Sequence, residues 1–548
     1  MFSSKIGVLP SSNAYNRKNV LHRNHYAFGA SMFMLLNVVL MPLKAYFSED
    51  LPWTHLIESP VSSNFTQFNQ TTLELYQHSY NRQSIPLGDV YYRDPLHSVH
   101  LVRVALNLSS WKPISSDQCI SSFILGLPGV PFYTECVYKI LCSLATSNES
   151  INSTVWHNKG VCTYDTFFRF YIGHLCFWLT SGNDLTVQNS TNLVTLYTSF
   201  VGYGSQEWFW CKFIFRILIS IFTLHILWRK YYKHCLSLEK VLIFHGHKLK
   251  VHHEQNWTYE VLWGDPTAMV LLHPYIATAF TIDCWFSVDR IVIAFLQMSQ
   301  SSNILVMLIG ILYLSRTVWF AYAALCITST FLKLKRKEHL FHEVDPTIVA
   351  IGATINGPIV SWMMSNTSFM LSSFHYLFKI TVPSELADYQ FDGCLTSSLY
   401  TLIVAMMPIT CGLLIPIFWK DKQVNNDRRY ASYKYNCVKT RFLFHLMHIF
   451  QGNAPKNVPS FGGTIYQFFK INPRYKQCPT ISFRSTDCFV YCYNNGKFCE
   501  KLRLSLLVSL DQNLSDKTIA VQMAQEPSSS PFNVLVPPDE KHFNPRLL

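Results

Sequence analysis

The sequence predicts an all-α polytopic membrane protein, with about six transmembrane helices and a disulfide-containing α+β extracytoplasmic domain between the first and second. About half of the 548 residues are apolar (49%) and only 14% are charged, whereas soluble domains carry roughly 25% charged residues. The apolar residues form runs of the length, roughly 20 residues, that a helix needs to cross a bilayer. Glycosylation acceptors gather in one long segment between two of these runs.

Six apolar runs are long enough to cross a bilayer as helices. Run length is the criterion because backbone amides in lipid must form their hydrogen bonds within their own segment. The first run is expected to be an uncleaved signal anchor, because no small-residue cleavage site follows it; a cleaved signal peptide is the alternative. A separate short segment at 291–298 would leave the topology unchanged, whereas an extra span within 287–332 would invert everything after it. The runs are residues 26–47, 209–228, 266–286, 303–332, 346–364 and 395–419.

Lysine and arginine near the ends of these runs set the orientation, because cytoplasmic flanks are enriched in them. Residues 1–25 contain basic but no acidic side chains, and basic clusters follow the second, fourth and sixth runs. Both termini are therefore expected in the cytoplasm. The domains are then a cytoplasmic segment 1–25, an outer domain 48–208, a transmembrane bundle 209–419, a basic cytoplasmic tail 420–525 and a disordered, Pro/Ser-rich C-terminus 526–548.

These features predict an integral protein of the plasma membrane or of a secretory-pathway membrane. Its main partner is expected to be the lipid bilayer. The basic tail is expected to meet anionic lipid head groups and not nucleic acid; the alternative is that its charges only set the topology.

The outer domain 48–208 has the size of one domain and should lie where disulfides persist. Within it, 64–79 is expected to be loop-like, 90–108 to form strands, and 164–179 to form an aromatic helix on the membrane surface. Its five cysteines are expected to form two disulfides and leave one thiol, with Cys211 as a further candidate partner. They are Cys119, Cys136, Cys142, Cys162 and Cys176. The expected glycosylation sites are Asn64, Asn69, Asn107, Asn148, Asn152 and Asn189, with Asn366 in the other outer loop.

The sequence contains no recognisable catalytic, cofactor or metal motif. The histidines within 245–253 lack the H-E-x-x-H spacing, and the tail cysteines within 478–499 lack paired C-x2-C knuckles. No P-loop, nucleophile elbow or kinase motif set is present either. We therefore expect no enzyme activity, no cofactor and no metal site.

Four polar residues inside the predicted spans are candidate functional groups: Arg316, His273, Asn356 and Asp283. An ionisable side chain at the bilayer centre costs roughly 2.5–3.5 kcal/mol on insertion scales, so each should face a partner or a water-filled path. We expect Arg316 to bind the Val270 carbonyl that Pro274 leaves free, and Asp283 to lie too near a span end to neutralise it.

Two functions are compatible with this pattern. The first is a receptor-like or scaffolding protein that acts through its outer domain, with the intramembrane polar groups holding the bundle together. The alternative is a transporter or channel that uses kinked third and fifth spans. A polar cavity reaching His273, Asn356 and Arg316 would favour transport, whereas a dry bundle under a folded outer domain would favour recognition.

Overall fold

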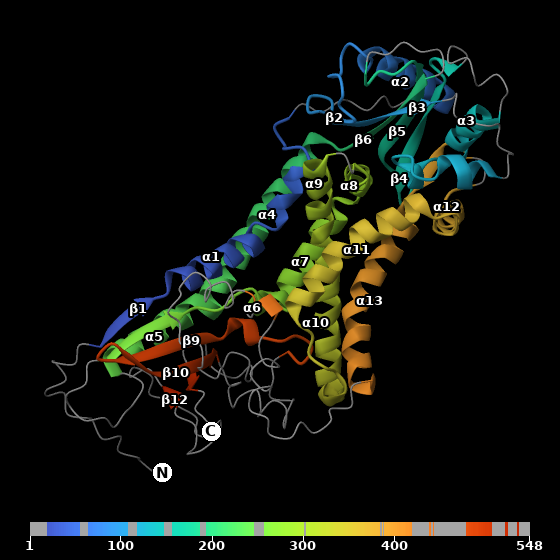
Figure 1. The fold of residues 1–548 in the computed structure, drawn as a ribbon. Helices are drawn as coiled ribbons and strands as arrows, with labels where there is room; N and C mark the ends of the chain where they lie inside the picture. The colour runs from blue at the N-terminus through green and yellow to red at the C-terminus, as the bar shows by residue number, and fades with distance from the viewer. Residues whose placement is uncertain are drawn as a thin grey trace.

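Two six-stranded β-sheets stand at opposite ends of a helical bundle in the computed structural model (Figure 1). The expected all-α class is therefore wrong. We call the two sheets the upper and the lower sheet, after their places in Figure 1. The structure describes residues 19–54, 64–107, 118–146, 156–186, 193–245, 257–300, 303–383, 386, 388–418, 438–439, 442, 478–506, 521–523 and 534–535.

The upper sheet belongs mainly to the predicted outer domain and has the order β2-β3-β6-β5-β4-β8. Every pair of neighbours is antiparallel except β4 and β8, which are parallel. The strands are β2 (Tyr91–Asp94), β3 (Val99–Asn107), β4 (Gly160–Phe167), β5 (Phe170–Ser181), β6 (Leu193–Gly202) and β8 (Gln390–Asp392). The helices α2 (Phe65–Ser79) and α3 (Glu135–Thr146) accompany it.

Two local expectations for this domain are wrong. Residues 164–179 fall in β4 and β5, because their bulky aromatic and β-branched side chains suit a pleated, half-buried surface. Residues 64–79 form the helix α2, whose polar composition hides three buried positions, Phe68, Thr72 and Tyr76, spaced four residues apart. The strands expected within 90–108 are present as β2 and β3.

The lower sheet joins segments that the sequence assigns to three separate cytoplasmic regions, in the order β1-β7-β9-β10-β11-β12. The N-terminal strand β1 pairs in parallel with β7, which pairs in turn with β9 from the tail. The strands are β1 (Val20–Arg23), β7 (Trp257–Leu262), β9 (Cys488–Asn494), β10 (Lys497–Leu506), β11 (Val521–Met523) and β12 (Val534–Leu535).

Four helical segments are long and apolar enough to cross a membrane: Gln206–Tyr232, Ile304–Lys335, Pro346–Asn366 and Cys394–Ile415. They correspond to four of the six predicted spans. They are built from α4 (Gln206–Leu227) with η9 (Trp228–Tyr232), from α9 (Ile304–Leu314), η11 (Ser315–Thr317) and α10 (Val318–Lys335), from α11 (Pro346–Asn366) and from α13 (Cys394–Phe418).

The other two predicted spans are shorter or broken. The first is α1 (His25–Val39) followed by the 3-10 helix η2 (Pro42–Phe47). The third is divided into α6 (Ala268–Leu271) and α7 (Pro274–Trp285), because Pro274 lacks an amide and starts a new helix.

Within the described residues the chain passes six times between the two sheets, through α1, α4, α6–α7, α9–α10, α11 and α13. Three other helices complete the bundle: α5 (Lys233–His245), α8 (Ile291–Met298) and α12 (Ser368–Thr381). The helix α8 is almost wholly buried and packs with β3, β5 and β6 residues in one apolar cluster. The upper sheet therefore sits directly on the bundle.

Candidate functional site: a buried charge network

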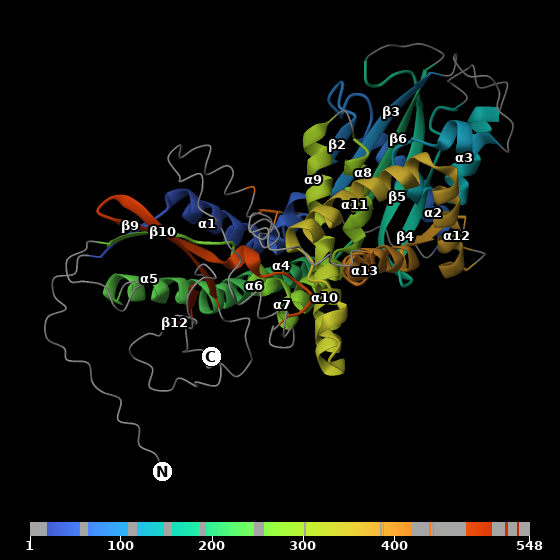
Figure 2. The ribbon, with the colours of Figure 1, turned by 60° about the horizontal axis from the view of Figure 1, so that its bottom comes forward.

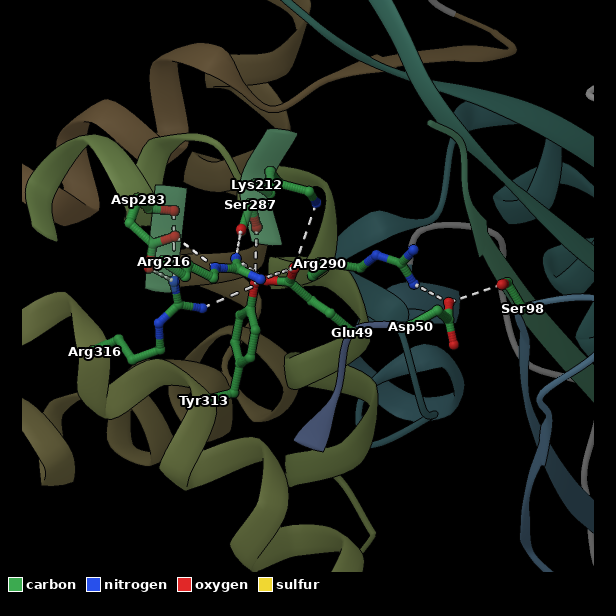
Figure 3. Close-up of polar contacts among 10 residues, drawn as sticks. All are labelled: Glu49, Asp50, Ser98, Lys212, Arg216, Asp283, Ser287, Arg290, Tyr313 and Arg316. Atoms are coloured by element: carbon green, nitrogen blue, oxygen red, sulfur yellow. Dashed lines mark hydrogen bonds and ion pairs between the residues drawn. The ribbon is translucent and has the colours of Figure 1, made fainter. Parts of the chain in front are cut away.

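Five charged side chains meet inside the protein where the bundle adjoins the upper sheet (Figure 3). None of them is more than 4% exposed. Charges this deeply buried are rare in proteins unless they are paired. The five are Glu49, Lys212, Arg216, Asp283 and Arg316.

Four separate elements bring these side chains together. Lys212 and Arg216 lie four residues apart on α4 and so project from the same face of that helix. Glu49 follows η2, and Asp283 lies in the last turns of α7. Arg316 is in η11, where a single 3-10 turn interrupts the long helix between α9 and α10. A tighter turn in mid-helix is a common mark of a functional or constrained position.

Glu49 is the centre of the network. Arg216 binds it in a two-pronged manner, with Nη1 donating to Oε2 at 2.8 Å and Nη2 to Oε1 at 2.9 Å. Lys212 Nζ lies 3.4 Å from Oε2, and the Tyr313 hydroxyl lies 3.1 Å from Oε1. Burial by itself raises the pKa of Glu49, but Arg216, Lys212 and Arg316 outweigh it and hold this pKa well below its ordinary value. The Glu49 side chain is therefore a carboxylate at neutral pH.

Asp283 completes the network on the bundle side. Arg216 Nε donates to Asp283 Oδ1 at 2.7 Å, and Arg316 Nη2 forms an ion pair with Oδ2. Arg216 thus bridges both buried carboxylates, and it also donates to Ser287 Oγ at 2.6 Å. Double donation by a planar guanidinium fixes the relative orientation of the groups it joins.

The expected role of Arg316 as a cap for the Pro274 break is wrong. The Val270 carbonyl accepts a hydrogen bond from the His273 amide at 3.0 Å, so the broken helix satisfies this group locally. Asp283, expected to lie too near the span end, is the main partner of Arg316. The physical reason is that η11 places Arg316 beside the C-terminal half of α7, where Asp283 lies, and not beside the N-terminal break.

Asp50 continues the network into the upper sheet. Its carboxylate accepts from Arg93 of β2 at 2.8 Å, from Ser98 at 2.7 Å and from Arg290 at 3.1 Å. Burial raises the pKa of Asp50, but Arg290 and Arg93 outweigh it and lower this pKa to about 2. Two consecutive carboxylates therefore have different partners: Glu49 binds bundle residues, whereas Asp50 joins Arg93 of the upper sheet to Arg290 of the 3-10 helix η10 (Val288–Arg290).

The other two intramembrane candidates, His273 and Asn356, are not members of this network. His273 precedes α7, ten residues before Asp283, which is roughly 15 Å at 1.5 Å per helical residue. Its ring packs against Phe222 with 6.0 Å between ring centroids. Asn356 is half-buried on α11. The structure thus brings Arg316 and Asp283 together and places His273 apart from them, while Asn356 lies beside Tyr400, which lines the cavity at Arg316, without joining the ion pairs.

A small cavity adjoins the network. Its volume is about 20 Å³, which accommodates roughly one water molecule. Its lining includes Arg316, Ser287, Tyr313, Thr317 and Tyr400. In the part of the chain that the structure describes, no group of three or more His, Cys, Asp or Glu side chains is placed to hold a metal ion. The arrangement at this site can bind and orient protein elements, but the cavity is too small for an organic substrate.

The outer-domain cysteines form two disulfides, Cys119–Cys142 and Cys162–Cys176, while Cys136 and Cys211 are free thiols. The second disulfide joins directly opposite residues of β4 and β5.

Four of the predicted glycosylation acceptors lie in described residues, all in elements at the upper-sheet end. Asn64 caps the N-terminus of α2 through a bond from the Thr66 amide, and Asn69 Oδ1 accepts from the Cys162 amide at 2.8 Å. Asn107 ends β3, and Asn366 ends α11. Asn148, Asn152 and Asn189 lie outside the described residues.

Sequence reasoning missed Glu49, Lys212 and Arg216. A signal was present, because the second predicted span carries two cations four residues apart on an otherwise apolar helix. Such a pair inside a bilayer requires carboxylate partners from other spans. The partners are Glu49, two residues after the first predicted span, and Asp283, inside the third.

Comparisons with known proteins give no family for this chain. No family model matches it, and neither the curated proteins nor the solved structures contain a match. Function is therefore inferred from the fold and the charge network alone.

Proposed function

We propose that this chain is a multi-pass membrane protein with a receptor-like or scaffolding role. The upper sheet and its helices form the extracytoplasmic recognition domain, the bundle anchors it in lipid, and the lower sheet lies in the cytoplasm with both termini. Four helices of spanning length and apolarity support membrane insertion. Six passes between the sheets support placing the N- and C-terminal strands on one side.

The charge network is the observation that favours recognition over transport. Its carboxylates are saturated by neighbouring cations and hydroxyls, and through Asp50 they clamp the upper sheet to the bundle. A buried ion network contributes little net stability, but it defines one arrangement of the elements that it joins. Such a network would hold a recognition domain in one orientation relative to its membrane anchor. A transport path instead needs polar groups that are accessible to water.

The remaining parts of the proposal concern partners and location. The protein resides in the plasma membrane or another secretory-pathway membrane, carries glycans on its outer face and has no catalytic role. Its basic tail meets anionic lipid head groups. Among the tail cations in the described residues, Lys439 pairs with Asp265 at 2.6 Å and Arg484 pairs with Glu343 at 2.5 Å.

Native cysteines provide the test that separates the two functions. Cys284 lies next to Asp283 and lines the cavity at Arg316, while Cys136 is a partly exposed thiol of the outer domain. Intact vesicles carrying the protein would be treated with a membrane-impermeant maleimide, and modified cysteines would be mapped by mass spectrometry. We expect modification of Cys136 and none of Cys284. Modification of Cys284 at a comparable rate would show a water path and support the transporter alternative.

Glycan mapping tests the orientation. Variants that keep a single acceptor are expected to be glycosylated at Asn107 and to remain bare at Asn513 in the tail. A glycan at Asn513 with none at Asn107 would reverse the proposed topology.

A further inference from the structure

The turn between β4 and β5 uses residues that such turns normally avoid. Phe167 pairs directly with Phe170, so Phe168 and Arg169 form a two-residue hairpin loop. Both have positive φ angles, 49° and 66°. Turns of this kind strongly prefer Asn-Gly or similar pairs, and a bulky side chain in the left-handed region is strained. Strain of this sort persists only where the surrounding structure enforces it, and it often marks a functional site.

The tip exposes two large apolar rings although its backbone is firmly held. Phe168 is 60% exposed and Phe170 is 76% exposed. The Arg169 amide donates to Asp392 Oδ2 at 2.8 Å, and the Gly393 amide donates to the Thr166 carbonyl at 3.1 Å. The exposure of the rings is thus part of the built conformation of the hairpin.

The position of the tip indicates what covers these rings. Residues 392–393 lead directly into α13, so the tip lies at Cys394, the first residue of a candidate membrane span. Figure 2 shows the lower end of β4 beside the start of α13. Further aromatic rings pack in pairs at the same end, with 4.9–5.6 Å between ring centroids. The pairs are Phe167 with Trp285, Tyr171 with Tyr203, and Trp208 with Phe286.

We propose that the β4–β5 hairpin tip inserts Phe168 and Phe170 into the lipid interface of the outer leaflet. This inference rests on the proposed membrane topology. The tip continues the apolar surface of α13 at the level where that helix leaves the hydrocarbon, and aromatic side chains favour this depth. The exposed Arg169 between the two rings suits a lipid phosphate. The outer domain then has a second attachment to the membrane besides its covalent links to the bundle.

Photo-crosslinking tests the insertion. p-Benzoyl-phenylalanine would replace Phe168 or Phe170 in the full chain, reconstituted in phosphatidylcholine vesicles, and adducts would be identified by mass spectrometry after irradiation. We expect phospholipid adducts at both positions. The matched control is Leu87, which is 57% exposed in the loop before β2 and close to Leu185 at the far end of the sheet; it should give no lipid adduct.

A further position separates failure of this inference from failure of the topology. Leu402 of α13 is 56% exposed and should face lipid if α13 spans the bilayer. Lipid adducts at Leu402 but not at Phe168 or Phe170 would overturn the insertion and leave the topology standing. The absence of adducts at all three positions would overturn both. Adducts from the hairpin positions to a second copy of the chain would show a protein interface and would also overturn the insertion.

Discussion

The two ends of the bundle are joined to their sheets by the same chemistry in different surroundings. At the upper end, Arg216 binds Glu49 inside a network whose charged side chains are each at most 4% exposed. At the lower end, Arg23 of β1 binds Glu239 of α5 with N–O distances of 2.6–3.0 Å, but here only the carboxylate is buried: the Arg23 side chain is 44% exposed and that of Glu239 is 5% exposed. Ion pairs in water contribute little, whereas breaking a buried pair leaves an uncompensated charge. The comparison teaches that burial, and not the type of contact, decides how strongly each junction depends on one residue.

The largest effect is expected from Glu49→Gln. Three cations lose their shared carboxylate, so the free energy of unfolding should fall by about 3–5 kcal/mol, the range found when one partner of a buried pair is removed. Thermal or denaturant unfolding in detergent micelles measures this change. The control is Asp388→Asn, which breaks an exposed pair with Lys139 and should change stability by less than about 1 kcal/mol. Equal effects of the two variants would show that water reaches the ion pairs of the upper junction.

A somewhat smaller loss of stability is expected from Asp283→Asn, because Arg216 still has Glu49 as a partner in this variant. Arg316 loses its main partner and keeps only a 3.5 Å contact with Glu49. Adding Arg316→Leu should restore part of the lost stability, since the uncompensated cation is then absent. The coupling free energy of this double-mutant cycle should lie in the range of about 0.5–3 kcal/mol. Strictly additive losses would contradict the pairing of Asp283 with Arg316.

Mild acid is expected to loosen the upper sheet before it affects the carboxylates. Burial lowers the pKa of His100 to about 3 and that of His174 to about 4. Because these folded-state pKa values lie below the ordinary value of 6.5, each neutral histidine contributes stability above pH 6.5 that is lost as the pH falls. The loss should be about 1.4 kcal/mol per pH unit for each group. Asp50, with a folded-state pKa of about 2, loses its contribution only below its ordinary value of 3.8.

Hydrogen exchange of β3 and β5 at pH 7 and pH 5.5 measures this effect. His174→Gln removes one titrating group and should make the pH dependence shallower. A pH dependence that is unchanged in His174→Gln would assign the acid sensitivity to other groups.

The smallest effect is expected from Arg23→Met at the lower junction. The exposed guanidinium is screened by water, and the buried Glu239 keeps a hydrogen bond from Trp263 Nε1, so the loss should be smaller than that of Glu49→Gln. Faster hydrogen exchange confined to β1 would match this expectation. A loss as large as that of Glu49→Gln would erase the difference between the two junctions.

Local sequence signals predicted the apolar passes and the first strands, because both depend on neighbouring residues. Four of the predicted spans and the strands within 90–108 follow from run length and alternation. The lower sheet could not be predicted in this way. Its central pairing joins β1, β7 and β9, which lie hundreds of residues apart, and charge near the spans had marked these segments only as cytoplasmic.

The charge network was half predictable. Arg316 and Asp283 stood out because charges are rare inside apolar runs, but their partnership depends on how η11 and α7 pack. Glu49 and Asp50 lie just beyond the first predicted span, where carboxylates are ordinary. Only the fold shows that this segment turns back into the protein, so that one carboxylate meets α4 and the next meets β2.

Hydrogen exchange in the Glu49→Gln variant tests most directly whether Glu49 and Asp50 couple the bundle to the upper sheet. If the two carboxylates couple these regions, hydrogen exchange should be faster in both α4 and β2–β3, because releasing the segment around Glu49 also displaces Asp50 from Arg93 and Ser98. Faster exchange in α4 alone, with β2–β3 protected as in the parent chain, would show that the two regions are held independently and would contradict the coupling.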